Sequence, residues 1–149
     1  MTTAPTPGQF QTPPFWASTW NAVLRLVNGP PAAPRSPGRD SLILDAAVAL
    51  RAGRVDDAAA LLAPHAAALA RDTAYLNLFG VACELRHEWR LARRFYGVAI
   101  SVDPAYPPAQ QNMRRLYELD RFGRSNLPPA LGDAELRRNR TLYRTHDND

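Results

Sequence analysis

The spacing of apolar residues over Ala74–Tyr106 predicts two antiparallel helices that are closed by a proline. One face of the first helix carries Leu76, Phe79, Val81 and Cys83. In the second helix, Ala92, Tyr96 and Ala99 follow at helical spacing, and Pro104 comes after them. Gly80 and Ala92 are small, as is required where two helix axes approach closely, and the larger side chains fill the groove beside them. We interpret the stretch as one helical hairpin.

A matching pattern lies 34 residues earlier and predicts another hairpin. Four pairs of positions share this register: Leu42 with Leu76, Ala46 with Gly80, Ala58 with Ala92, and Leu62 with Tyr96. Gly53 lies where a turn is needed between helices over Ser41–Ala52 and Val55–Ala63. Pro64 predicts a kink or an early end of the second helix, because proline lacks the backbone N–H that the helix would use.

A single helix is expected after the second hairpin. Pro107–Pro108 can begin it, a helix over Ala109–Leu119 would place Met113, Leu116 and Tyr117 on one side, and Phe122-Gly123 would close it. Such a helix would shield the last hairpin, since helical repeats cannot bury both of their faces alone. Further on, Asp133 is placed to cap a short helix over Ala134–Tyr143.

These positions resemble the tetratricopeptide (TPR) repeat, whose pattern is an aromatic residue, Leu-Gly, an aromatic, a later Ala, an aromatic and a closing Pro. Gly80, Ala92 and Pro104 match this pattern, Phe79 and Tyr96 match it in kind, and other residues replace the remaining aromatics. The resemblance implies an all-α fold, namely a short TPR-like array of helical hairpins (an α-solenoid) with an extended Pro-rich N-terminal arm. The implied domain covers residues 39–126, with repeats at 39–72 and 73–106 and a capping helix at 107–123.

The Pro-rich arm precedes this domain. We divide it into a flexible lead over 1–14, an amphipathic helix over 15–28 and a stiff linker over 29–38. The apolar face of the helix comprises Phe15, Trp16, Trp20, Val23, Leu24 and Val27. A face with two tryptophans must be buried, and three surfaces could cover it: the chain's own repeat domain, the groove of another protein, or a membrane. The sequence leaves these three alternatives open.

Charge and cysteine content narrow the possible partners. The net charge is +4, but residues 39–106 carry eight arginines against eight acidic residues, so the excess lies in the flanks. Without a basic stripe across the predicted domain, we do not expect nucleic-acid binding. The lack of lysine beside abundant alanine is typical of GC-rich coding sequence. A single cysteine, with no signal sequence and no long apolar run, predicts a cytoplasmic protein that is at most peripheral to a membrane complex.

No pattern in the sequence indicates catalysis. His65, His87 and His146 lack companions at metal-ligand spacing, and there is no Gly-rich phosphate loop. Cys83 lies on the small-residue face, and we interpret it as a buried apolar filler rather than a nucleophile. The chain is therefore expected to be non-catalytic, with no cofactor and no metal.

The TPR resemblance implies that the first helix of each hairpin lines a concave surface that binds peptides or partner helices. The residues that alignment places on this strip are Ile43, Ala47, Leu50, Asn77, Val81, Glu84, Gln111 and Arg115. One TPR subclass grips a C-terminal carboxylate with Lys, Asn and Arg, and Ile43, Ala47 and Leu78 stand at the equivalent positions here. The mostly apolar strip instead suits an amphipathic helix or a hydrophobic segment of a partner. The chain's own helix over 15–27 is an alternative occupant.

Two groups of arginines could also meet a partner. Near the turn of the second hairpin, Glu84 and Glu88 are expected to pair with a group that we interpret as a solvated face: Arg86, Arg90, Arg93 and Arg94. The Arg-rich tail over 127–149 has less compensation, and the candidates there for binding partner carboxylates are Arg137, Arg138, Arg140 and Arg144.

Two functional hypotheses follow. One is a protein–protein interaction module that binds one or more proteins by its groove, its Trp-containing helix, or both. The alternative is an accessory structural subunit that is permanently built into a larger complex, including one at a membrane, and stabilises it through the Pro-rich arm. The sequence identifies neither the partner nor the state of the groove.

Overall fold

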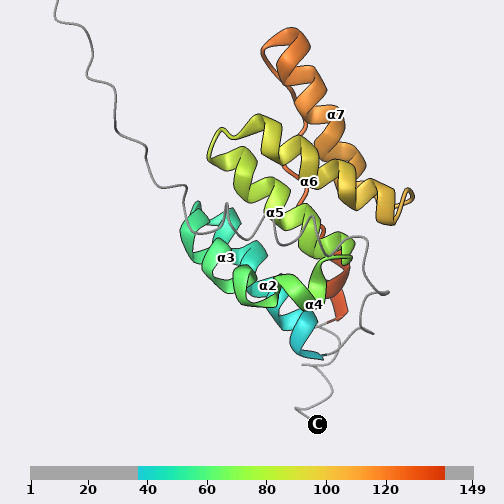
Figure 1. Ribbon diagram of the computed structural model, residues 1–149. Coiled ribbons are helices and arrows are strands. Elements are labelled where there is room, and N and C mark those ends of the chain that lie inside the picture. The colour runs from blue at the N-terminus through green and yellow to red at the C-terminus, as the bar shows by residue number, and fades with distance from the viewer. Residues whose placement is uncertain (1–36, 140–149) are drawn as a thin grey trace, which may run out of the picture.

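The computed structural model describes residues 37–139, and all regular secondary structure in that range is helical (Figure 1). Helix α2 (Pro37–Arg51) forms a hairpin with α3 (Val55–Leu62), and α5 (Thr73–Leu85) forms another with α6 (Trp89–Val102). Helix α7 (Pro107–Phe122) packs against α6 and α5. The all-α class expected from the sequence is confirmed for the described residues. Residues 1–36 of the expected arm, which was predicted over 1–38, lie outside them.

The first hairpin ends as Pro64 predicts. Helix α3 stops at Leu62, a 3₁₀ turn η1 (Ala63–His65) follows, and a short helix α4 (Ala66–Leu69) continues from it. Proline cannot donate a backbone hydrogen bond, so the tighter turn accommodates it. At the other end, α2 begins at Pro37, inside the stretch predicted as a linker over 29–38, because proline is tolerated in the first turn of a helix.

Helix α5 is the centre of the core. Every residue from Ala74 to Glu84 is buried, and α5 contacts α2, α3, α6 and α7. Phe79 stacks on Phe95 with ring centroids 5.3 Å apart and meets Tyr75 edge-on at 5.1 Å. The hydroxyl of Tyr75 donates to the carbonyl of Leu62 at 2.8 Å, which ties the centre of the core to the end of α3.

The two hairpins repeat with a period of 34 residues. Their second helices begin at Val55 and Trp89, and the turns before these helices contain Gly53 and His87, both with positive φ (76° and 62°). Gly80 lies where α5 meets α6, because an added Cβ would stand 2.3 Å from the ring of Tyr96. The close approach predicted at Gly80 is therefore present.

A side chain fixes the start of α5, and a glycine ends α7. Asp72 caps α5 by accepting from the backbone N–H of Tyr75 at 3.0 Å, and it also accepts two bonds of 2.8 Å from Arg39 in α2. Helix α7 ends at Gly123, whose φ of 69° gives the left-handed C-cap that glycine favours. After this glycine the chain turns back and runs past α5 toward α2, and residues 134–139 are helical (Figure 1).

Candidate partner-binding groove

The eight residues predicted to line a concave strip lie on three helices. Ile43, Ala47 and Leu50 are on α2, Asn77, Val81 and Glu84 are on α5, and Gln111 and Arg115 are on α7. The first six are buried and the last two are half-buried. Ile43, Ala47, Leu50 and Val81 belong to the core between the helices. Residues 125–133, which the sequence assigned mainly to the tail, lie against the polar end of the strip and bond to Asn77, Gln111 and Arg115. We call residues 125–133 the C-terminal segment.

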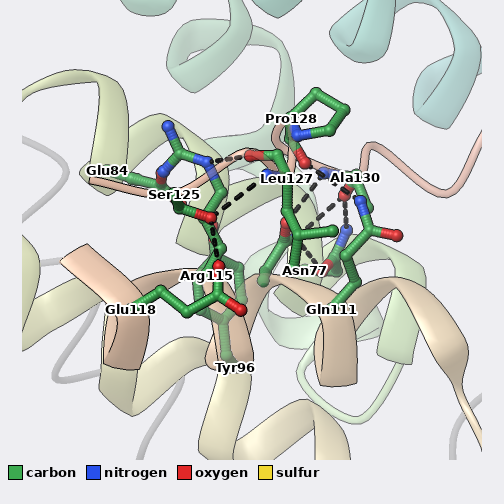
Figure 2. Close-up of polar contacts among 11 residues, drawn as sticks. Asn77, Glu84, Tyr96, Gln111, Arg115, Glu118, Ser125, Leu127, Pro128 and Ala130 are labelled. Carbon is green, nitrogen blue, oxygen red and sulfur yellow. Dashed lines mark hydrogen bonds and ion pairs between the residues drawn. The ribbon is translucent and has the colours of Figure 1, made fainter. Parts of the chain in front are cut away.

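Two asparagines bind the main chain of the C-terminal segment at Ala130 (Figure 2). The backbone N–H of Ala130 donates to Oδ1 of Asn112 at 2.7 Å. The carbonyl of Ala130 accepts from Nδ2 of Asn77 at 2.8 Å and from Nδ2 of Asn112 at 2.9 Å. Asn112 also donates to Oδ1 of Asn77 at 2.9 Å, so the two amides orient each other. With the segment in place both side chains are fully buried.

Helix α7 makes two further contacts to the main chain of the segment, at residues that precede Ala130. Nε of Arg115 donates to the carbonyl of Leu127 at 2.7 Å, and Nε2 of Gln111 donates to the carbonyl of Pro128 at 3.0 Å (Figure 2). Arg115 is held in place by an ion pair with Glu84, whose other oxygen accepts from the hydroxyl of Tyr96 at 2.9 Å. A buried network from α6 and α5 thus aims a guanidinium group of α7 at the groove.

The far end of the segment is fixed by charge. The carboxylate of Asp133 is only 4% exposed, and it accepts from Arg51 of α2 at 2.9 and 3.0 Å and pairs with Arg137 at 3.2 Å. Beside it, Gly132 has a φ of 76°, and an added Cβ would stand 2.1 Å from the hydroxyl of Tyr106. Asp133 also stands where the sequence predicts the start of a short helix: residues 134–139 are helical, and the carbonyl of Asp133 accepts from the backbone N–H of Arg137 at 2.9 Å.

Burial and charge set the protonation of the network. Burial lowers the pKa of Arg115, but the guanidinium remains protonated at neutral pH because its ordinary pKa is so high. Burial also raises the pKa of the Tyr96 hydroxyl, so Tyr96 stays a donor toward Glu84. At the start of the segment, a 2.6 Å hydrogen bond from Ser125, and then a hydrogen bond from Arg114, lower the pKa of Glu118.

The arrangement recognises backbone rather than side chains. Five hydrogen bonds run from Asn77, Gln111, Asn112 and Arg115 to the peptide groups of Leu127, Pro128 and Ala130. The side chains over 127–131 are half-buried or exposed, so the helices contact the main chain of this run more than its side chains. Chemically, the groove can hold an extended peptide by its main chain, as in other modes of peptide recognition.

The other predicted site residues do not contribute to the groove among the described residues. Phe15, Trp16, Trp20, Val23, Leu24, Val27, Arg140 and Arg144 lie outside the described residues. Arg137 pairs with Asp133, and Arg138 is exposed. At the turn of the second hairpin, Arg86 pairs with Asp56 and lies 3.8 Å from Glu88. The predicted pairing of Glu84 with that cluster is wrong, since Glu84 is buried on the opposite, groove side of α5.

Residues with other potential chemistry are buried or dispersed. Cys83 is 1% exposed, and burial raises the pKa of its thiol well above the ordinary value. Within residues 37–139, His, Cys, Asp and Glu side chains form no group of three that could hold a metal ion. None of the helices in that range combines the length and apolarity that crossing a bilayer requires.

Two contacts of the groove were missed from the sequence: Arg51 and the carboxylate of Asp133. The alignment places Asn112 beside Gln111 at the end of the strip, and both side chains bond to the main chain of the C-terminal segment. The signal for Arg51 and Asp133 was only that each is a charged residue on an otherwise apolar stretch. Their separation of 82 residues in the chain hides the pair from any local pattern.

No family model matches the chain, and neither a curated protein nor a solved structure is significantly similar to it.

Proposed function

We propose that the chain is a non-catalytic, TPR-like protein–protein interaction module that binds an extended, partly apolar segment of another protein in the groove formed by α2, α5 and α7. The observation that carries the proposal is the pair Asn77 and Asn112. Both are completely buried, and both direct their amides at the peptide group of Ala130. Such amides satisfy the backbone of any extended segment, so the groove is equipped to receive a peptide.

The TPR-like part of the proposal is supported by the 34-residue period. Gly53 and His87 occupy equivalent turns with positive φ, and Gly80 and Tyr96 make the close helix contact that the repeat pattern requires. Of the two types of ligand that the sequence suggests, an extended segment is better supported than an amphipathic helix. A helix satisfies its own peptide groups and would leave Asn77 and Asn112 without backbone partners.

A peptide selection tests the function. A random library displayed in many copies on phage is selected against the immobilised full chain, since multivalent display compensates for competition by the chain's own segment. Selected peptides are then synthesised and their affinities measured by calorimetry for the wild-type chain and for a double variant, Asn77→Leu with Asn112→Leu. Leucine keeps the γ-branched shape of asparagine and removes both amides, so the variant loses the polar contacts without opening a cavity.

We expect the selected peptides to bind the wild-type chain and to lose binding to the double variant. Circular dichroism checks that the variant keeps its helical content. If no peptide is selected, or if the peptides bind the double variant equally well, the groove is not a peptide-binding site.

A second candidate, the accessory structural subunit, is favoured by exposed aromatic side chains on α6 and α7. Trp89 on α6 and Tyr117 and Phe122 on α7 are 43%, 60% and 66% exposed. Trp89 also lines a pocket of about 410 Å³ together with Arg93, Leu116, Leu119, Asp120 and Gly123. Large exposed apolar side chains are typical of surfaces that a second protein covers. A subunit of this kind should aggregate when purified alone and become soluble with its complex, which light scattering would detect.

A further inference from the structure

The C-terminal segment is attached to the groove in a way that another segment could reproduce. Its hold over residues 127–130 is made by main-chain hydrogen bonds, and Leu127, Pro129, Ala130 and Leu131 are only half-buried. Any extended chain offers the same N–H and C=O groups. An incoming segment that repeats these bonds therefore pairs with the amides of Asn77 and Asn112 as the resident segment leaves. The exchange exposes little of the core.

Two positions of the segment do depend on the amino-acid sequence. Gly132 adopts a left-handed φ of 76°, and its missing side chain leaves room for Tyr106, whose hydroxyl would stand 2.1 Å from a Cβ. Asp133 inserts its carboxylate beside Arg51, where it is 4% exposed. The groove thus reads a Gly-Asp pair at the end of an extended run, because only glycine fits the first position and only an acid satisfies the second.

The Arg51 end is also where a competitor could start. The side chain of Arg51 is 44% exposed, so a second carboxylate can approach it from solvent while Asp133 is still bound. Two prolines, Pro128 and Pro129, keep the resident run extended, and an incoming run gains from the same stiffness.

We propose that residues 127–133 are a built-in occupant of the groove, and that the partner segment is an extended, proline-containing apolar run ending in Gly-Asp, which displaces them. The inference rests on the proposed function and adds to it the chemistry of the ligand and the competition that regulates its binding. A tethered occupant has an effective concentration on the order of millimolar, so it weakens every partner's apparent affinity. A change that weakens the binding of the resident segment therefore raises the apparent affinity of the groove for the partner.

The test uses a fluorescein-labelled peptide with the sequence of residues 125–138 as the probe and measures its binding to full chains by fluorescence anisotropy. Asp133→Ala in the chain weakens the resident segment without changing the groove. We expect the peptide to bind this chain about 10- to 100-fold more tightly than wild type, the factor that losing a charge-assisted contact supplies. Peptides carrying Gly132→Ala or Asp133→Ala should bind the same chain at least about tenfold more weakly than the unaltered peptide.

A second chain variant keeps the test independent of any folding defect in the first. Arg51→Ala breaks the same ion pair from the side of α2. In a chain that carries both Arg51→Ala and Asp133→Ala, the unaltered peptide and its Asp133→Ala version should bind equally, because the arginine that distinguishes them is gone. This closes a double-mutant cycle between the peptide's aspartate and Arg51.

Three results would overturn the inference. Equal binding of the peptide to the folded Asp133→Ala chain and to wild type would make the resident segment a permanent part of the fold. Phage-selected peptides that need Asn77 and Asn112 but lack Gly-Asp would keep the proposed function and refute this ligand. A concentration-dependent dimer of the wild-type chain in light scattering, dispersed by Asp133→Ala, would make the occupant the segment of a second copy.

Discussion

Replacing Gly80 by alanine tests the packing of the second hairpin most severely. The new Cβ would stand 2.3 and 2.6 Å from two ring carbons of Tyr96, whereas carbon atoms in contact normally lie about 3.5–4.0 Å apart. Either the ring or the helix must therefore move by roughly 1 Å. The ring has little freedom, since Tyr96 is fully buried and its hydroxyl is bonded to Glu84.

The magnitude follows from three contributions. Overpacking of a core costs about 1–3 kcal/mol, and losing the hydrogen bond from Tyr96 to an ion-paired carboxylate costs about 1.5–3 kcal/mol. The higher helix propensity of alanine returns about 1 kcal/mol. We expect Gly80→Ala to lower the free energy of unfolding by about 1.5–5 kcal/mol, which is a large part of the stability of a small domain.

Urea unfolding followed by circular dichroism at 222 nm measures the change, and Gly97→Ala is the matched control. Gly97 is also a helical glycine, but its added Cβ would meet nothing closer than Met113 at 3.8 Å. The control should be unchanged or up to about 1 kcal/mol more stable than wild type. If Gly80→Ala were as stable as Gly97→Ala, the close contact between α5 and α6 would be refuted.

Two further predictions concern the cap of α5 and the buried thiol. Asp72→Ala removes both the cap on the N–H of Tyr75 and the bidentate contact with Arg39, so urea unfolding should show a loss of about 2–4 kcal/mol in the free energy of unfolding. As a control, replacing the exposed Asp57 by alanine should cost less than about 1 kcal/mol, and equal losses for the two variants would contradict the capping role of Asp72. Burial raises the pKa of the Cys83 thiol and shields it from solvent. A thiol reagent at pH 8 should therefore react with the native chain only as fast as the chain unfolds, and should react immediately with the chain unfolded in guanidinium. Rapid reaction of the native chain would show that the thiol is accessible.

The sequence predicts the helices of this chain well because their signals are local. The small residues Gly80 and Ala92 and the turn glycine Gly53 are read directly from spacing, and the helix ends at Pro64 and Gly123 follow from backbone chemistry. Each of these residues acts on neighbours within one or two turns. The periodicity is therefore enough to place them.

The occupied groove could not be predicted in the same way. The pattern predicts the strip as a surface, but the segment bound to it has the proline and glycine content of a loop. Its attachment depends on contacts across 12 to 82 residues of sequence. Asn77 was placed on the strip, yet nothing in the pattern says that its amide meets Ala130. Long-range pairing of this kind is decided by tertiary packing, to which local periodicity is insensitive.

Hydrogen exchange at the backbone amide of Ala130 tests the central claim most directly. In the free chain this N–H donates to Oδ1 of Asn112 at 2.7 Å in a half-buried site, so its exchange should be slowed relative to an unstructured peptide. Saturation with the peptide of residues 125–138 should remove this protection, while amides of the buried helix α5 keep theirs. Protection that persists at Ala130 with the peptide bound, or that is lacking in the free chain, would contradict an exchangeable segment seated in the groove.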